Sequence, residues 1–209
     1  MARPDRLVVV VGTGTGVGKT WVTARLIELC RAKGLRVAAR KPAQSFAAGE
    51  VTDAEILSGA SGEKPDEVCR PHRWFDRPLA PPMAAEVLGL GAFSIADLAG
   101  ELAWPEAVDL GFVEGAGGVR SPLAADGDAV DLIRELGPDV VVLVADPGLG
   151  TLNLVRLSVD ALTGQPVVVY LNRFDDGDDL HRRNRQWLEM QNQLTIETNP
   201  APMVKRILQ

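Results

Sequence analysis

Four short apolar runs, separated by segments with helical periodicity, constrain what this chain can fold into more than any other feature. They lie at Leu7–Val11, Leu110–Val113, Val140–Ala145 and Val167–Leu171, and a weaker fifth run lies at Arg36–Ala39. The runs are continuously apolar instead of alternating with polar residues, which is typical of strands that are covered on both faces. We therefore expect a parallel sheet with helices on both sides.

Helices are expected between these runs. Val22, Leu26 and Leu29 fall on one face of a helix predicted over Thr20–Lys33. Further helices are predicted at Asp53–Gly59, Ala84–Leu88, Ser94–Ala103, Val130–Leu136, Thr151–Thr163 and Asp179–Gln193. The proline-rich segment Glu63–Pro82 is expected to be irregular, because proline lacks a backbone donor. The alternation predicts an α/β fold with a doubly wound, mostly parallel sheet, like that of P-loop NTPases, in a single domain over residues 1–209.

Five polar or glycine-rich segments lie at the ends of these predicted strands. They read GTGTGVGKT, KPAQS, EGAGG, ADPGLG and LNR. The carboxyl ends of parallel strands meet at one edge of a sheet, and ligands collect there. We therefore expect the five segments to form one binding site.

The first of these segments, Gly12–Thr20, has the features of a phosphate-binding loop, because it joins a predicted strand to a predicted helix and ends in G-K-T. The usual spacing would place a glycine where Thr13 stands, whereas Gly12 lies one residue earlier. We interpret this offset as a loop that is one residue longer than usual. The backbone amides expected to face a β-phosphate are those of Gly16, Val17, Gly18 and Lys19. The ammonium group of Lys19 would bridge phosphates, and the Thr20 hydroxyl would bind Mg²⁺.

Three charged residues follow other predicted strands. Glu114 comes directly after an apolar run, where a carboxylate is costly to bury without a partner. Asp53 begins a predicted helix, so it is equally suited to cap that helix or to bind Mg²⁺. Lys41 ends the second strand beside the loop edge, where it could neutralise a reacting anion or simply be solvated.

Composition narrows the class of protein. The chain has 22 Lys and Arg residues against 28 Asp and Glu, a net charge of −6, and no basic run, so no nucleic-acid or membrane partner is expected. The apolar run near the N-terminus is too short for a signal peptide, and we expect a cytoplasmic location. The two cysteines and two histidines have no metal-binding spacing.

Taken together, the segments resemble the dethiobiotin synthetase family. The resemblance runs in order from about Leu7 to Asn172 and is carried by GTGTGVGKT, KPAQS, TDAEI, PLAPPMAA, VEGAGG, GLGTLN and LNR. The offset glycine is also what the loop of that family looks like. The resemblance implies a P-loop ligase that uses ATP to carboxylate 7,8-diaminononanoate with CO₂ and to close the ring of dethiobiotin, through a carbamate and its mixed anhydride with phosphate.

The resemblance also implies roles for individual residues. Mg²⁺ would be held by Thr20, Asp53 and Glu114, and the catalytic residues would be Lys41, Lys19 and Thr15. The nucleotide would be bound by Gly14, Thr15, Gly16, Val17, Gly18, Lys19 and Thr20, with Asn172 facing the base. Ser45 would hold the carbamate together with Lys41, and Gly150, Thr151 and Asn153 would bind the substrate carboxylate across the interface of a homodimer. From the residues alone, Gly150 could equally be a turn residue.

The sequence departs from the family pattern in two places. Phe46 stands where the family commonly has glycine, and the chain diverges after Asn172, where the base-binding segment is not recognisable. The sequence is also compatible with two other functions, those of an amide-forming ligase of the cobyrinate type and of a nucleotide-switched partitioning ATPase. The former commonly carries a fused glutaminase domain, for which 209 residues leave no room, and the latter has a signature lysine where this chain has Gly14. A related enzyme that acts on another diamine is a third alternative.

Overall fold

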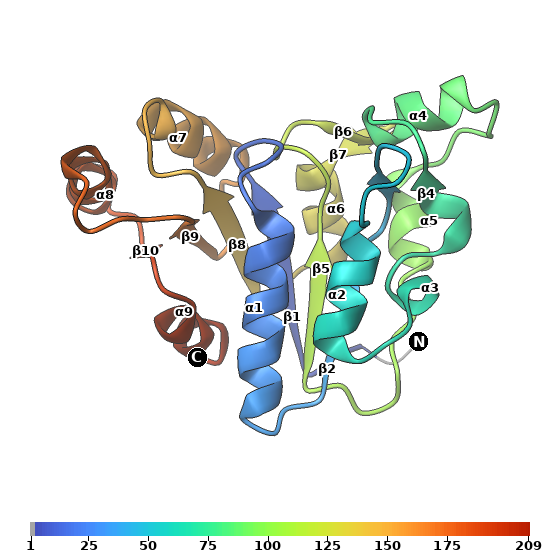
Figure 1. Ribbon diagram of the computed structural model, residues 1–209, viewed down its shortest axis with the longest axis horizontal. Helices are drawn as coiled ribbons and strands as arrows, with labels where there is room; N and C mark the ends of the chain where they lie inside the picture. The colour runs from blue at the N-terminus through green and yellow to red at the C-terminus, as the bar shows by residue number, and fades with distance from the viewer. Residues whose placement is uncertain (1–2) are drawn as a thin grey trace.

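A six-stranded sheet forms the centre of the computed structural model, which describes residues 3–209 (Figure 1). In sheet order the strands are β10 (Ile196–Glu197), β9 (Val167–Leu171), β8 (Val140–Ala145), β1 (Arg6–Gly12), β5 (Leu110–Glu114) and β2 (Val37–Arg40). Every neighbouring pair in this sheet is parallel. The predicted parallel, doubly wound sheet is therefore confirmed, and the carboxyl ends of its strands share one edge.

The central strand β1 shows why the apolar runs are continuous. Leu7, Val9 and Val11 belong to the core on one face of the sheet, whereas Val8 and Val10 belong to the core on the other face. All five side chains are at most 3% exposed. Because successive side chains of a strand point to opposite faces, a strand covered on both sides needs apolar residues at every position.

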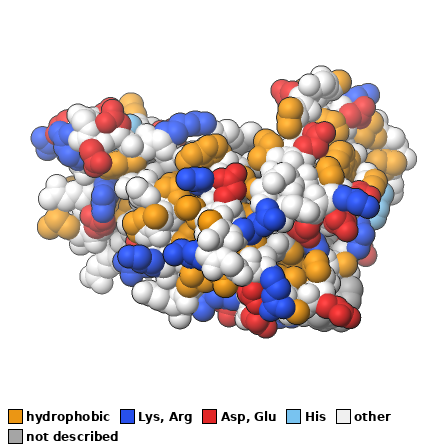
Figure 2. Space-filling view, turned by 60° about the horizontal axis from the view of Figure 1, so that its bottom comes forward, with side chains coloured by type: hydrophobic (Ala, Val, Ile, Leu, Met, Phe, Trp, Pro, Cys, Tyr) orange, Lys and Arg blue, Asp and Glu red, His pale blue; other side chains and the backbone are white. Residues whose placement is uncertain are grey.

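The helices form two layers around this sheet. The core on one face contains side chains of α1 (Lys19–Ala32), α2 (Asp53–Ser61), α3 (Pro65–Val68) and α9 (Pro200–Ile207). The core on the other face contains side chains of α4 (Pro81–Val87), α5 (Ile95–Gly100), α6 (Ala129–Leu136), α7 (Thr151–Ala161) and α8 (Asp179–Gln191). None of the helices in the described part of the chain is long and apolar enough to cross a membrane. On the face drawn in Figure 2, basic and acidic side chains are interspersed.

The segment Glu63–Pro82 differs from the prediction, because it is not wholly irregular. It contains α3, a 3₁₀ turn at Pro71–Arg73, the short strand β4 (Trp74–Phe75) and the start of α4. Pro65, Pro71 and Pro81 each begin a helical segment instead of blocking one, since the first helical position needs no backbone donor. Strand β4 pairs in parallel with β3 (Gln44–Ser45), which brings this segment against the loop that follows β2.

Other elements were shorter than predicted or were missed. Helix α5 covers only part of the expected Ser94–Ala103, and β6 (Pro122–Ala124) forms a small antiparallel pair with β7 (Gly127–Asp128). Strand β10 and helix α9 lie in the divergent C-terminal part of the chain. Two-residue strands carry too little periodicity to be recognised from sequence.

Gly111 in β5 provides a test of the packing. A Cβ atom added there would lie 2.4 Å from Cγ of Pro4 and 2.7 Å from Cζ3 of Trp104. We expect Gly111→Ala to lower the free energy of unfolding by about 1–3 kcal/mol, because overpacking forces its neighbours to move. Urea unfolding of the purified variant measures this change.

A matched control is Gly59→Ala in the interior of α2. Apart from its chain neighbours and the backbone of its own helix, no atom of the described residues lies within 4 Å of a Cβ added at this exposed position. We expect this variant to be more stable than wild type by about 0.5–1 kcal/mol, because alanine favours the helix over glycine. A similar response of the two variants would contradict the packing described for β5.

Candidate active site

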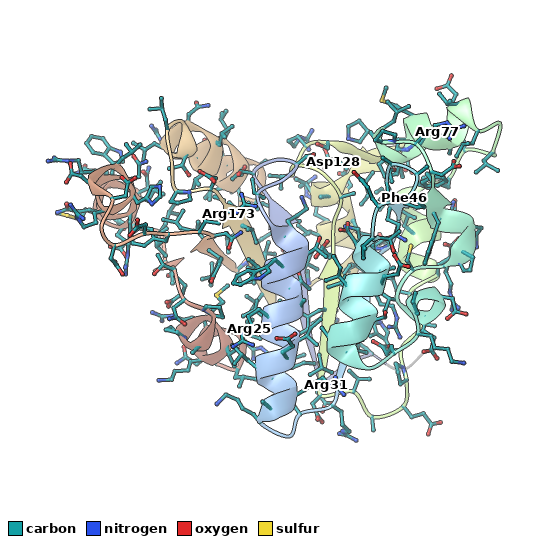
Figure 3. All side chains as sticks on the ribbon, in the orientation of Figure 1. Arg25, Arg31, Phe46, Arg77, Asp128 and Arg173 are labelled. Atoms are coloured by element: carbon teal, nitrogen blue, oxygen red, sulfur yellow. The ribbon has the colours of Figure 1, made fainter. Side chains whose placement is uncertain are left out.

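The phosphate loop joins β1 to α1 and is held in place by Asn172, which lies far from the loop in the sequence. Gly18 caps α1 with a φ of 91°, and a Cβ atom added there would lie 2.2 Å from Nδ2 of Asn172. The same Nδ2 atom donates a hydrogen bond of 2.9 Å to the carbonyl oxygen of Val17. Asn172 directly follows β9, and Figure 3 shows the next residue, Arg173, beside the N-terminal end of α1. The loop therefore requires glycine at position 18 both for its backbone conformation and for the approach of Asn172.

Lys19 connects the phosphate loop to the loop after β5. Its ammonium group donates to the carbonyl oxygens of Gly14, at 3.1 Å, and Gly117, at 2.8 Å. Burial and the nearby charge of Lys41 lower the pKa of Lys19 to about 8, although Glu114 and Asp53 act in the opposite direction. The side chain is thus poised over the loop with its donors directed at two backbone acceptors.

A buried ion cluster lies beside this loop. The ammonium group of Lys41 lies 2.6 Å from Oδ2 of Asp53 and 2.8 Å from Oε1 of Glu114, and it also donates to the carbonyl oxygen of Gly115 at 3.0 Å. The side chains of Lys41 and Glu114 are 1% and 0% exposed, so neither charge has solvent to stabilise it. Burial disfavours the charged form of Lys41, but Glu114 and Asp53 outweigh it and hold the pKa of Lys41 above its ordinary value. Lys41 is therefore a fixed cation and not a proton acceptor.

Two threonine hydroxyls from α1 complete the cluster. The Thr20 hydroxyl lies 2.8 Å from Oδ1 of Asp53 and 2.9 Å from Oε1 of Glu114. One turn further along, the Thr23 hydroxyl lies 2.7 Å from Oε2 of Glu114. Both oxygens of the Glu114 carboxylate thus have donors, as a buried carboxylate requires.

The oxygen atoms of Thr20, Asp53 and Glu114 fit a magnesium ion. Carboxylate and hydroxyl oxygens are hard ligands of the kind that Mg²⁺ prefers, and they converge here within hydrogen-bonding distance of one another. Among residues 3–209, no group of three or more His, Cys, Asp or Glu side chains is arranged to hold a metal ion. Two carboxylates and a hydroxyl are characteristic of Mg²⁺ that is also bound by phosphate, and not of a site made by protein alone.

A cavity of about 700 Å³ opens between the ion cluster and the loops around it. This volume lies in the range of small-molecule sites. Its polar wall includes Lys19, Thr20, Lys41 and Asp53, and its apolar wall includes Phe46, Pro78, Leu79, Pro81 and Pro122. Phe46 contacts Trp74 edge-on, with ring centroids 6.3 Å apart, and lies at the same edge of the sheet as the phosphate loop (Figure 3). The cavity can accept a ligand with an anionic end and an aliphatic end.

Comparison with known proteins decides the family. A family model described as an AAA domain matches residues 6–196. The ATP-dependent dethiobiotin synthetase BioD of Anaeromyxobacter dehalogenans (strain 2CP-C) is 44% identical over 177 residues, which cover 81% of this chain and 78% of that protein. The protein of the same name from Haloferax mediterranei is 40% identical over 195 residues, which cover 91% of this chain and 82% of its own length. The chain belongs to the dethiobiotin synthetase family.

Solved structures with the same fold include more distant proteins. The signal recognition particle receptor FtsY from Elizabethkingia anophelis has a TM-score of 0.53 and 14% identity, and the match covers 100% of this chain and 67% of that chain. The cell division protein FtsY from Thermotoga maritima has a TM-score of 0.52 and 15% identity over 100% and 70% of the two chains. At such identities the similarity shows the fold alone.

The structure brings most of the predicted site residues of this dethiobiotin synthetase family member together. The predicted residues that line the cavity are Thr15, Gly16, Gly18, Lys19, Thr20, Lys41, Ser45 and Asp53. Glu114 contacts Lys41 and Thr20. The carbonyl oxygen of Gly14 accepts a hydrogen bond from Lys19, and that of Val17 accepts one from Asn172. Gly150, Thr151 and Asn153 lie at the start of α7 and do not line this cavity. The individual roles of all these residues stay predictions.

Two residues of the site were assigned no individual role from the sequence. Thr23 contacts Glu114, and its place three residues after Thr20 puts it on the same face of α1, a signal that helical spacing could have given. Gln44 lines the cavity beside Ser45; the sequence placed it in the KPAQS segment but gave it no role of its own. The apolar wall formed by Pro78, Leu79 and Pro81 comes from the segment that was expected to be irregular.

The contact between Thr23 and Glu114 leads to a testable prediction. Thr23→Val preserves the shape of the side chain but leaves Oε2 of the buried Glu114 without the hydroxyl donor, which we expect to cost about 1–3 kcal/mol of unfolding free energy. Thr23→Ser keeps the hydroxyl and is the matched control. Chemical unfolding of the two variants should show the larger loss in Thr23→Val, and a larger loss in Thr23→Ser would contradict the assignment.

Proposed function

We propose that this chain is an ATP-dependent dethiobiotin synthetase, which joins CO₂ to 7,8-diaminononanoate and closes the ureido ring. The relatives described above carry this name. The structural observation that carries the proposal is the buried ammonium of Lys41, fixed between Asp53 and Glu114 at the end of the cavity beside the phosphate loop. A fixed cation in that position suits a reaction in which an anion attacks a phosphate.

The proposed reaction has three bond-forming steps. One amine of the substrate attacks CO₂ and loses a proton, which gives a carbamate. A carbamate oxygen then attacks the γ-phosphorus of ATP, and the bond from this phosphorus to the ADP oxygen breaks. The second amine attacks the carbamoyl carbon, loses a proton and displaces phosphate, which closes the ring. Each step needs close placement of charged groups more than covalent help from the protein.

In this proposal the phosphate loop binds ATP. Amide groups from Gly14 to Thr20 and the positive end of the α1 dipole face the phosphates, and the Lys19 ammonium exchanges its carbonyl partners for phosphate oxygens. Thr15, which lines the cavity, contacts the same phosphates. Asn172, held against the loop, faces the base.

Thr20, Asp53 and Glu114 would hold Mg²⁺ beside the phosphates, and the ion would supply charge neutralisation and orientation of the β- and γ-phosphates. Lys41 supplies a further positive charge at the carbamate, and Ser45, whose hydroxyl is buried and has no partner among the described residues, donates to it. The same carboxylates that orient Lys41 would thus orient the metal. The chain's contribution to the rate is a preorganised set of charges.

The central test is ADP release in bicarbonate buffer. We expect release to require ATP, Mg²⁺ and 7,8-diaminononanoate together. Lys41→Ala should lower kcat by roughly 100-fold or more, because it removes the fixed charge opposite the reacting anion, while the ATP dissociation constant changes little. Lys41→Arg should not restore the rate, since a planar fork replaces a compact ammonium.

The controls separate the possible failures of this proposal. Equal losses of ATP binding and turnover in Lys41→Ala would make Lys41 a nucleotide ligand. Full activity of Glu114→Gln at limiting Mg²⁺ would contradict the proposed metal site. A wild-type protein that releases ADP equally well without the diamine would overturn the proposed substrate.

The proposed partners are these small molecules and a second copy of the chain. Gly150 caps α7, Leu149 beside it is 93% exposed, and Leu154 and Leu157 on the same helix are 46% and 60% exposed. The Thr151 hydroxyl is buried without a hydrogen-bond partner among the described residues. We infer a homodimer in which this helix end binds the substrate carboxylate of the other subunit. A cytoplasmic location without nucleic-acid or membrane partners stays a prediction from composition.

Mixing two inactive variants tests the shared site. Thr151→Pro removes the hydroxyl and one amide at a helical position that tolerates proline. In a heterodimer of Lys41→Ala and Thr151→Pro chains, one site would carry both changes and the other neither. We expect random mixing to restore about one quarter of the wild-type rate, because half the dimers are mixed and one of their two sites is intact. Activity from a monomer in light scattering, or no recovery on mixing, would contradict the shared site.

A further inference from the structure

Gln44 is a buried amide that the mechanism above does not use. The residue is 2% exposed and lines the cavity between the ion cluster and the apolar wall. Its Nε2 atom is buried and has no hydrogen-bond partner among residues 3–209. Buried polar groups are almost always paired, so a donor left free at the wall of a cavity indicates a ligand acceptor.

The orientation of this amide is fixed by α2. The Oε1 atom of Gln44 accepts a hydrogen bond of 2.9 Å from the backbone N–H of Ala54, in the first turn of the helix. A backbone N–H can donate only to the amide oxygen, so the two ends of the Gln44 amide cannot exchange. The NH₂ group of Gln44 is therefore the end that is free for a ligand.

In this arrangement all three N–H donors of the neighbouring Lys41 ammonium group are already used. An ammonium group has three donors, and those of Lys41 are directed at the three acceptors Asp53, Glu114 and the carbonyl oxygen of Gly115. The Nε2 atom of Gln44 and the Ser45 hydroxyl, by contrast, are buried in residues that line the same cavity, and neither has a partner among the described residues. An anion bound beside Lys41 would feel its charge but would take its direct hydrogen bonds from Gln44 and Ser45.

We propose that Gln44 donates a hydrogen bond from Nε2 to a carbamate oxygen of the carboxylated diamine, an inference that rests on the proposed function. A neutral amide suits this task because the carbamate must remain nucleophilic toward phosphorus. A cation in direct contact with the carbamate would stabilise it before it reacts and so lower its reactivity. The contact also fixes the plane of the carbamate, so that one oxygen is held while the other is free to attack. Gln44 is then a substrate-binding residue, and Lys41 acts at longer range.

The test compares Gln44→Met with wild type. Methionine has a similar length but no amide donor. We expect kcat/KM for 7,8-diaminononanoate to fall by about tenfold or more, with the ATP dissociation constant within about twofold of wild type. Without ATP, the ¹³C NMR signal of carbamate formed from the bound diamine and labelled bicarbonate should weaken in parallel.

Thr52→Val is the matched control for the contact of Gln44 with α2. Thr52 caps the same helix end through Glu55 and does not line the cavity. Its loss should lower Tm and leave kcat/KM within about twofold of wild type, since the carbamate contact is intact. Equal losses of kcat/KM in Gln44→Met and Thr52→Val would overturn the proposal, because Gln44 would then only support the helix.

Gln44→Glu keeps an acceptor for the backbone N–H of Ala54 and removes the NH₂ donor. It replaces Gln44→Met in the test if Gln44→Met does not fold. Unchanged kcat/KM and carbamate signal in this variant would overturn the role of Gln44 and leave the proposed function intact. A loss of ATP affinity as large as the loss of kcat/KM in Gln44→Met would reassign the amide to phosphate and overturn the carbamate contact. Failure of the wild-type protein to turn over the diamine would overturn the proposed function and, with it, this inference.

Discussion

Glu114 is a carboxylate with no exposure to solvent, and the arrangement of the site follows from the need to compensate its buried charge. It ends β5, next to the central strand, where the two helical layers leave no water around it. Its compensation comes from Lys41 after β2 and from two hydroxyls on α1. One buried charge thereby ties together the phosphate loop, the second strand and the first helix, because separating any of them would remove at least one donor of the carboxylate.

The same compensation explains why Lys41 is held so firmly. A lysine side chain has many rotamers and normally loses entropy when it is fixed. Here three acceptors from α2, β5 and the following loop determine the position of its ammonium group. The conformational entropy of the Lys41 side chain is thus lost during folding, and the side chain needs no further ordering when an anion binds.

Much of this site could be predicted from the sequence because its charged residues lie where strands end. Glu114 closes an apolar run and Lys41 follows another, so their meeting at one edge follows from the parallel sheet alone. The place of Gln44 in the KPAQS segment was predicted, but its individual role was not, since that role depends on how α2 docks against a two-residue strand. The apolar wall that includes Pro78, Leu79 and Pro81 was missed for a related reason, because it depends on how an irregular segment and the start of α4 pack over the cavity. Strand β10 has only two residues and a polar context, which leave no periodic signal to read.

The position of Asn172 has a consequence for the synthesis of the protein. The phosphate loop is encoded near the N-terminus, yet its support comes from a residue late in the chain, and β1 itself pairs only with β5 and β8. Chains grow from the N-terminus, so a ribosome-bound chain that has not yet extended beyond β9 carries the loop without its neighbour. The contact that holds the phosphate loop against Asn172 therefore forms only after most of the polypeptide has been synthesised.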